Sequence, residues 1–331
     1  MTDILLLVTG LVLLLLGGEL LVRGAVAIAE RLGMSPLLIG LTLVGFGTSA
    51  PELVTSVQAA LADAPGIAVG NVVGSNISNI LLILGVSALI APIRVGSSAL
   101  ARDGVVMVIV CLAFAILGFG WTLDRLAGLL FVSGLAAYVA LAYRQERVPG
   151  ARHGAAFEKA EAYEEVHDGP LRHARTAPTR AEPQPYVAAS MAVGGLAIVV
   201  IGGHLLVEGA VGIARSRGIP ETLIGLTIVA VGTSMPEFVT SVVAAVRRHS
   251  DVALGNVLGS SIYNILGIAG VTGLISPTTI PPAIVAFDNL VMVAASVALL
   301  LFAATGRRIG RLEGGLLLAG YAAYLLALRP T

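Results

Sequence analysis

The sequence predicts an all-α polytopic membrane protein with ten transmembrane helices, arranged as two inverted-topology repeats of five helices. Three observations predict this class: an apolar composition, ten long apolar stretches and an internal duplication. Hydrophobic residues make up 56% of the 331 residues and charged residues only 12%, whereas soluble domains carry about 25% charged residues. Together with a mean hydropathy of +0.93, this composition excludes a soluble enzyme, a disordered protein and a coiled coil.

The charges and the single cysteine exclude further classes. Twenty basic and twenty acidic residues cancel, so no net field draws in nucleic acid. Cys111 is the only cysteine and allows no intrachain disulfide. The 40 glycines are typical of closely packed membrane helices, where small residues let backbones approach.

Ten apolar stretches are long enough to cross about 30 Å of hydrocarbon. The first lacks a basic n-region and is too long for a signal peptide, so we expect it to remain as a spanning helix. The predicted spans are 4–29, 36–62, 67–91, 103–120, 124–143, 186–214, 221–246, 252–275, 283–304 and 311–328.

One long polar stretch, 144–184, separates the first five spans from the last five. It contains seven Lys or Arg residues and seven Asp or Glu residues. Its acidic part, 157–169, lacks the glycine and the oxygen spacing of an EF-hand loop, so we expect a solvated, partly helical loop there. The predicted organisation is a first repeat over 1–143, a cytoplasmic linker over 144–184 and a second repeat over 185–331.

The two halves are copies of each other. A shift of 185 residues aligns 17–33 with 202–218, and it aligns 40–85 with 225–270 without a gap at 27 identical positions of 46. Such self-similarity indicates an internal duplication. Because each copy has an odd number of predicted spans, the second must enter the membrane from the opposite side.

The basic residues predict the orientation of these repeats. With the N-terminus outside, the loops on the inner side contain 15 Lys or Arg residues and those on the outer side four. Basic residues concentrate in cytoplasmic loops. We therefore expect a multi-pass protein of the plasma (inner) membrane, with both termini outside and the 144–184 loop in the cytoplasm.

Two glutamates lie in the middle of strongly apolar segments, GTSAPE (47–52) and GTSMPE (232–237). A carboxylate at this depth costs several kcal/mol and usually marks an ion pathway. The alternative is an ion pair with a basic residue of another helix. No Lys or Arg lies in the middle of a predicted span except Arg23, which is near one end of its span, so we expect Glu52 and Glu237 to have no basic partner.

The residues around each glutamate suit a hard cation. Pro51 and Pro236 should break their helices, and carbonyls freed at such a break can hold ions. The nearby carboxylate, hydroxyl, amide and carbonyl oxygens are ligands that Ca²⁺ or Na⁺ prefers, whereas Zn²⁺ or Cu⁺ would favour Cys or His. The alternative role for the small polar residues is helix packing. The candidates are Thr48, Ser49, Ser75, Asn79, Thr233, Ser234, Ser260 and Asn264.

These motifs, GTSAPE with GNVVGSNISN and GTSMPE with GNVLGSSIYN, resemble the two alpha repeats of the calcium/cation antiporter superfamily, sodium/calcium exchanger type. The resemblance covers nearly the whole chain. It implies four central sites, one for Ca²⁺ and three for Na⁺, with Ca²⁺ held by Glu52, Glu237 and main-chain oxygens of Thr48 and Thr233. It implies one Na⁺ site at Ser49, Ser75 and the Gly45 carbonyl, and a mirror site at Ser234, Ser260 and the Ala230 carbonyl.

One departure from the family pattern concerns the charge of the site. Some relatives carry Asp where this chain has Asn264, and Asn79 is at the mirror position. Only two formal charges remain, which argues against dependence on K⁺.

The resulting hypothesis is an antiporter that exchanges Ca²⁺ for Na⁺ by alternating access. H⁺ coupling through the same glutamates is the alternative within transport, and a passive cation channel is the alternative from another class. We expect no enzymatic activity, no cofactor beyond the transported ions, a lipid bilayer as surroundings and no nucleic-acid partner. The oligomeric state does not follow from the sequence.

Overall fold

The computed structural model describes residues 2–32, 45–95, 98–119, 122–146, 155, 158–159, 184–304 and 307–328. Nearly all of these are helical. The elements of the first half are α1 (Thr2–Arg31), α3 (Gly45–Gly47), α4 (Ala50–Leu61), α5 (Pro65–Ile77), the π-helix η2 (Ser78–Ile83), α6 (Leu84–Ile90), β1 (Ile93–Arg94), α7 (Ser98–Gly118), β2 (Thr122–Leu123) and α8 (Arg125–Glu146).

The second half has a similar order of elements. They are α10 (Pro185–Arg217), α11 (Glu221–Ile224), the π-helix η4 (Gly225–Val229), α12 (Ala230–Thr233), α13 (Met235–Val246), α14 (Ser250–Ile262), the π-helix η5 (Tyr263–Ala269), α15 (Gly270–Ile275), β3 (Thr278–Thr279), the π-helix η6 (Ile284–Asp288), α16 (Asn289–Ala304), β4 (Arg308–Ile309) and α17 (Arg311–Ala327).

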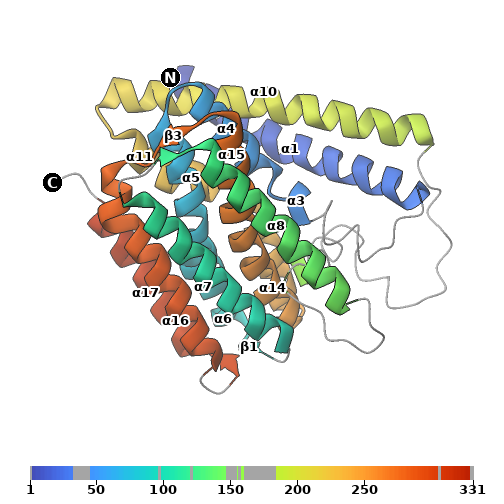
Figure 1. Ribbon diagram of the computed structural model, residues 1–331, viewed down its shortest axis with the longest axis vertical. Coiled ribbons are helices and arrows are strands. Elements are labelled where there is room, and N and C mark those ends of the chain that lie inside the picture. Colours follow the sequence, from blue (N-terminus) through green and yellow to red (C-terminus); the bar gives the residue numbers. More distant parts are fainter. Residues whose placement is uncertain are drawn as a thin grey trace.

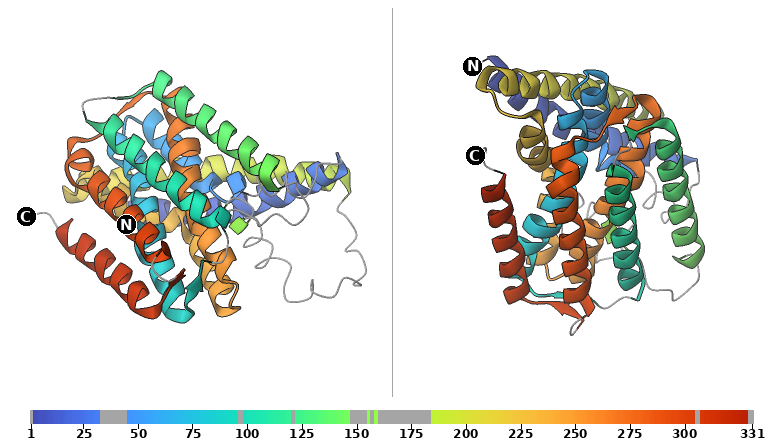
Figure 2. Two further views of the ribbon diagram at one scale, coloured as in Figure 1. Left: turned by 60° about the horizontal axis from the view of Figure 1, so that its bottom comes forward. Right: turned by 60° about the vertical axis from the view of Figure 1, so that its left-hand side comes forward.

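The two longest helices, α1 and α10, lie side by side and run antiparallel across one end of the bundle (Figures 1 and 2). Glycines allow this close contact. A Cβ atom on Gly10 would lie 2.4 Å from the backbone nitrogen of Leu206, and one on Gly195 would lie 2.4 Å from that of Leu21. Two helix backbones can approach this closely only where no side chain intervenes.

The bundle has a buried centre and an apolar exterior. All of α5 from Gly66 onwards is buried, and α14 is equally buried from Val252 onwards. On the outside of α7, four large apolar side chains are exposed along one face at spacings of three and four residues: Val105, Ile109, Leu112 and Ile116. An apolar exterior around a buried, partly polar centre is typical of a protein surrounded by lipid.

The structure confirms the predicted class of fold, an all-α multi-pass membrane protein. Among the described residues, six helices are long and apolar enough to span a membrane, or seven if the bent pair Glu221–Thr233 and Met235–Val246 forms one span. The total of ten spans stays a prediction, and part of the predicted span 36–62 lies outside the described residues.

Two short antiparallel strand pairs connect the two halves of the chain by hydrogen bonds. β1 pairs with β4, and β2 pairs with β3, so each pair joins one half of the chain to the other. β1 and β3 occupy equivalent positions in the two copies, 185 residues apart. They lie at opposite ends of the bundle (Figure 1), which is the arrangement expected of inverted repeats.

Candidate functional site

Both proline-containing segments break at the predicted places, and the breaks have the same geometry. Ser49 precedes α4 with φ −92° and ψ 12°, and Ser234 precedes α13 with φ −82° and ψ 11°. The second break bends its span by 51°. Each proline lies in the first turn of the new helix, where the N–H that it lacks has no helical partner. The sequence therefore correctly predicts both breaks.

The breaks place both glutamates at helix N-termini inside the protein. Glu52 is the third residue of α4 and Glu237 the third residue of α13. Each is only 2% exposed. The positive end of a helix dipole stabilises a negative charge there, which offsets part of the cost of burying a carboxylate.

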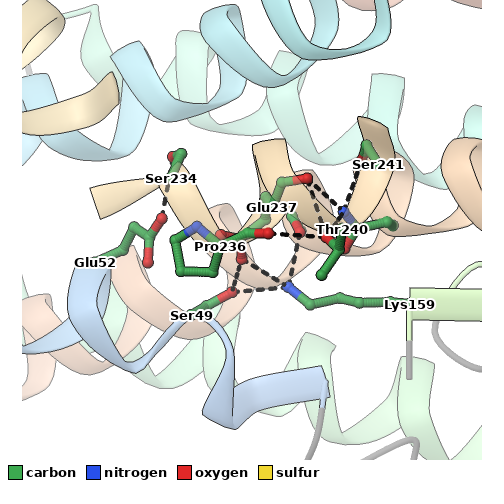
Figure 3. Close-up of polar contacts among 10 residues, drawn as sticks. Ser49, Glu52, Lys159, Ser234, Pro236, Glu237, Thr240 and Ser241 are labelled. Atoms are coloured by element: carbon green, nitrogen blue, oxygen red, sulfur yellow. Dashed lines mark hydrogen bonds and ion pairs between the residues drawn. The ribbon is translucent and has the colours of Figure 1, made fainter. Parts of the chain in front are cut away.

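The serine of each break contacts the glutamate of the other repeat. Ser234 Oγ donates a hydrogen bond of 3.0 Å to Glu52 Oε1. Ser49 Oγ donates one of 3.4 Å to Glu237 Oε1 (Figure 3). These crossed contacts bring the two motifs, which lie 185 residues apart in the sequence, into one polar centre.

Two asparagines that were not among the predicted site residues brace the breaks. Asn71 Nδ2 donates to the Glu52 carbonyl at 3.0 Å and to Ser56 Oγ at 2.9 Å. Asn256 Nδ2 donates to the Glu237 carbonyl at 3.0 Å, and also to Thr240 Oγ1 and Ser241 Oγ, each at 2.8 Å. Each asparagine follows a glycine, and the Gly–Asn pair is identical at the same position of the two copies. This identity between the copies could have indicated both asparagines as site residues.

Helices α5 and α14, and the π-helices η2 and η5 that follow them, supply further oxygens. Ser75 Oγ lies 3.5 Å from the carbonyl oxygen of Ala230. Asn79 and Asn264 lie in the equivalent π-helices η2 and η5, a local structure that recurs at functional sites and that the sequence did not predict. The threonines Thr48 and Thr233 are buried at the breaks, and Gly45 begins α3.

The expected grouping of the two Na⁺ sites differs from the contacts in the structure. Ser75 was grouped with Ser49 but lies against Ala230 of the second repeat. On the other side, Ser49 and Ser260 share one neighbour, the amine of Lys159. Ser75 of the first repeat therefore lies at the helix break of the second repeat, and Ser260 of the second repeat shares the Lys159 amine with Ser49 at the break of the first. The two repeats interlock at this point.

Several buried polar atoms of this centre have no hydrogen-bond partner among the described residues. They are Oε2 of Glu52, Oε2 of Glu237 and both side-chain amide atoms of Asn79 and of Asn264. A buried polar atom without a partner costs about 1–3 kcal/mol, and such atoms are uncommon in folded proteins. Two carboxylate oxygens and two amide oxygens in this condition form a ligand set that suits a hard cation.

The linker contributes a basic residue to the site, contrary to expectation. Lys159 is 1% exposed, and its Nζ forms an ion pair of 3.4 Å with Glu237 Oε1. Glu158 is also buried, so these two linker residues are not part of a solvated loop. The prediction that neither glutamate has a basic partner is wrong for Glu237, because Lys159 comes from the linker and not from a predicted span. Arg23 instead pairs with Glu19 of its own helix.

An apolar bundle built from two inverted repeats, with paired glutamates at crossed helix breaks, defines a membrane carrier for cations. The family model described as "Sodium/calcium exchanger protein" matches residues 2–144 and 187–329. The chain therefore belongs to the sodium/calcium exchanger family.

The chain is similar to known members over almost its full length. It is 39% identical to CaxA of Alkalimonas amylolytica, with 95% of each chain covered. It is 38% identical to the sodium/calcium exchanger MaX1 of Methanosarcina acetivorans, with 98% of each chain covered. Among solved structures, that of the sodium–calcium exchanger NCX_Mj soaked with Na⁺ and Sr²⁺ superimposes with a TM-score of 0.63, at 31% identity and 99% coverage of both chains.

Proposed function

We propose that this protein is an antiporter that exchanges Ca²⁺ for Na⁺ across the plasma membrane by alternating access. Membership of the sodium/calcium exchanger family supports cation antiport. The observation that carries the choice of ion is the pair of buried glutamates, each with one carboxylate oxygen unpartnered among the described residues. Two such carboxylates balance one Ca²⁺, and both lie at helix breaks linked by the crossed serine contacts. Broken helices of this kind are where transporters bind their substrates.

The proposed ion ligands are the residues that the crossed breaks gather. Ca²⁺ binds the two glutamates and main-chain oxygens of the adjacent threonines. Of the three Na⁺ sites, one lies near Glu52 and a second near Glu237, grouped as the contacts above indicate. The full set is Glu52, Glu237, Thr48, Ser49, Ser75, Asn79, Thr233, Ser234, Ser260, Asn264, Gly45 and Ala230.

A site with two carboxylates makes the exchange electrogenic. One Ca²⁺ leaves the loaded site neutral, whereas three Na⁺, the number that the family resemblance implies, leave one positive charge. The two half-cycles then move different charge, so membrane voltage must affect the rate. A proton-coupled exchanger with the same glutamates would respond instead to a pH gradient.

A flux assay tests this function. Proteoliposomes loaded with Na⁺ and diluted into K⁺ medium should take up ⁴⁵Ca²⁺, and vesicles without a Na⁺ gradient should not. Valinomycin, which makes the interior positive, should accelerate uptake, and a protonophore should have no effect. Uptake that needs a pH gradient and stops with a protonophore would instead support H⁺ coupling. Non-saturable uptake without any counter-ion would support a channel.

We also propose the orientation that the basic residues favour, with both termini outside and the 144–184 linker in the cytoplasm. In a Cys111→Ala background, cysteine at position 179 should react with a membrane-impermeant thiol reagent only in inside-out vesicles. Cysteine at position 3 should react only in right-side-out vesicles. Reaction of both positions from the same side of the membrane would contradict inverted repeats in this orientation.

A further inference from the structure

Lys159 is the only lysine of the chain; the other 19 basic residues are arginines. It comes from the linker rather than from a span, yet its side chain is fully buried. Its Nζ donates to Ser260 Oγ at 2.7 Å. It also donates to Ser49 Oγ at 2.9 Å and lies 3.4 Å from Glu237 Oε1 (Figure 3). An ammonium group has three hydrogens to donate, and here all three have an oxygen partner.

The three residues that contact this amine have three symmetry-related counterparts in the other half of the site. The duplication relates Glu52, Ser234 and Ser75 to Glu237, Ser49 and Ser260. In the first set, Ser234 bonds Glu52 and Ser75 lies against Ala230. In the second set, the ammonium of Lys159 contacts all three members. Among the described residues, no basic side chain hydrogen-bonds any member of the first set, so one of two symmetric half-sites already holds a positive charge.

The segment that carries Lys159 is docked at several points. The Ala155 N–H donates to Asp103 Oδ2 at 2.6 Å, and the Lys159 amine lies 5.6 Å from the centre of the Tyr263 ring. The segment lies against two glycines of α14. A Cβ atom on Gly255 would lie 2.1 Å from Cβ of Glu158, and one on Gly259 would lie 3.2 Å from the Ala155 carbonyl oxygen.

The equivalent glycines of the first repeat have different neighbours. Gly70 and Gly74 of α5 lie against Leu226 and Ala230, on the helix that leads into the second break. In the second repeat, the described neighbours of the equivalent glycines belong to the linker. The duplicated groove on α14 therefore receives a segment that is outside the duplication.

We propose that Lys159 is a tethered cation that occupies the Glu237 half of the ion site from the cytoplasmic side and competes there with the transported ion. Ca²⁺ needs both carboxylates, and it therefore binds only when the ammonium has left Glu237. The inference rests on the proposed function for the identity of the ion. It follows that cytoplasmic ion must displace the linker segment before exchange begins, which sets the apparent affinity on that side.

Three variants test the competition through Ca²⁺ binding to the purified full-length protein, measured by calorimetry. Lys159→Met removes the charge but keeps the length, and should bind Ca²⁺ about tenfold more tightly if the lysine holds the site about nine-tenths of the time. Lys159→Arg keeps the charge and should stay within about twofold of wild type. Gly255→Ala keeps the lysine but clashes with Glu158, and should tighten binding as Lys159→Met does.

Unchanged or weaker binding in Lys159→Met would overturn the proposal. Equal tightening by the Met and Arg variants would also overturn it, because the charge would then have no part in the competition. A Gly255→Ala variant that binds Ca²⁺ as wild type does would contradict the docking of the linker segment in the α14 groove.

The single lysine allows a second test that does not depend on transport. A trace of amine-acetylating reagent, with peptide mass spectrometry, reports the reactivity of Lys159, and the α-amino group of the chain serves as internal reference. In choline buffer Lys159 should be protected. Saturating Ca²⁺ or Na⁺ should raise its acetylation by up to about tenfold, because a lysine that is free about one-tenth of the time then becomes free throughout.

The two tests separate failure of the inference from failure of the function. A lysine that is reactive in choline, or that no cation exposes, overturns the tethered-cation proposal even if Na⁺-driven Ca²⁺ uptake occurs. Exposure of the lysine by Na⁺ or Ca²⁺ without any Na⁺-driven uptake retains the competition and rejects the proposed exchange.

Discussion

Replacement of either buried glutamate, as Glu52→Gln or Glu237→Gln, should abolish Ca²⁺ exchange. The amide has nearly the shape of the carboxylate but no charge, and a single remaining carboxylate cannot balance a divalent ion removed from water. Loss of one partner of a buried charge pair costs about 3–5 kcal/mol, so Ca²⁺ binding should weaken at least about 100-fold. Calorimetry on purified variants and ⁴⁵Ca²⁺ flux in proteoliposomes measure this directly.

The control for these variants is Glu208→Gln on α10. Glu208 is exposed and lies near His204 of the same helix, so its loss should leave both binding and flux at wild-type values. All three variants should be purified in similar yield, because each change preserves side-chain volume. Near-normal exchange by either buried-site variant would contradict a Ca²⁺ site shared between the two repeats.

Gly195→Leu should prevent the protein from folding stably. A Cβ atom at this position of α10 would lie 2.4 Å from the backbone nitrogen of Leu21 and 2.8 Å from the carbonyl oxygen of Gly17. Backbone atoms cannot move aside as a flexible side chain can, so the leucine must separate α1 from α10. Overpacking of a core costs about 1–3 kcal/mol or more, and here the clash affects the longest helix pair of the protein.

The adjacent residue provides a matched control, because a Cβ atom on Gly194 would meet no other atom within 4 Å. Gly194→Leu should therefore behave as wild type in size-exclusion chromatography and thermal unfolding. Gly195→Leu should give a much lower monodisperse yield or a melting temperature lower by about 5 °C or more. Equal behaviour of the two variants would contradict the backbone contact between α1 and α10.

The sequence predicts most of the fold because the relevant signals are local or periodic. Apolar length predicts spans, proline predicts both helix breaks, and the duplication places Glu52 and Glu237 at the same register. The π-helices at Asn79 and Asn264 could not be predicted in this way. They are set by tertiary packing of buried helices, and no residue type in these segments specifies an extra residue per turn.

The site was less predictable than the fold because its contacts cross between repeats. Nothing in the spacing of Ser49 and Ser75 reveals that each lies with residues of the other copy. Asn71 and Asn256 occupy identical positions in the two copies, but a neutral amide is not as unusual within the membrane as a carboxylate, so the sequence does not single them out. Lys159 was missed because a polar linker is ordinarily solvated, although its status as the only lysine was available from the sequence.

The strand pairs that join the two halves and the crossed serine–glutamate contacts have a consequence for how the molecule evolved. Neither half of the chain contains the whole of the proposed ion site, since each glutamate is hydrogen-bonded by a serine of the other half. An ancestor with only one repeat would have needed two copies inserted in opposite directions to form the same centre. Fusion of two such copies into one chain would fix their opposite insertion.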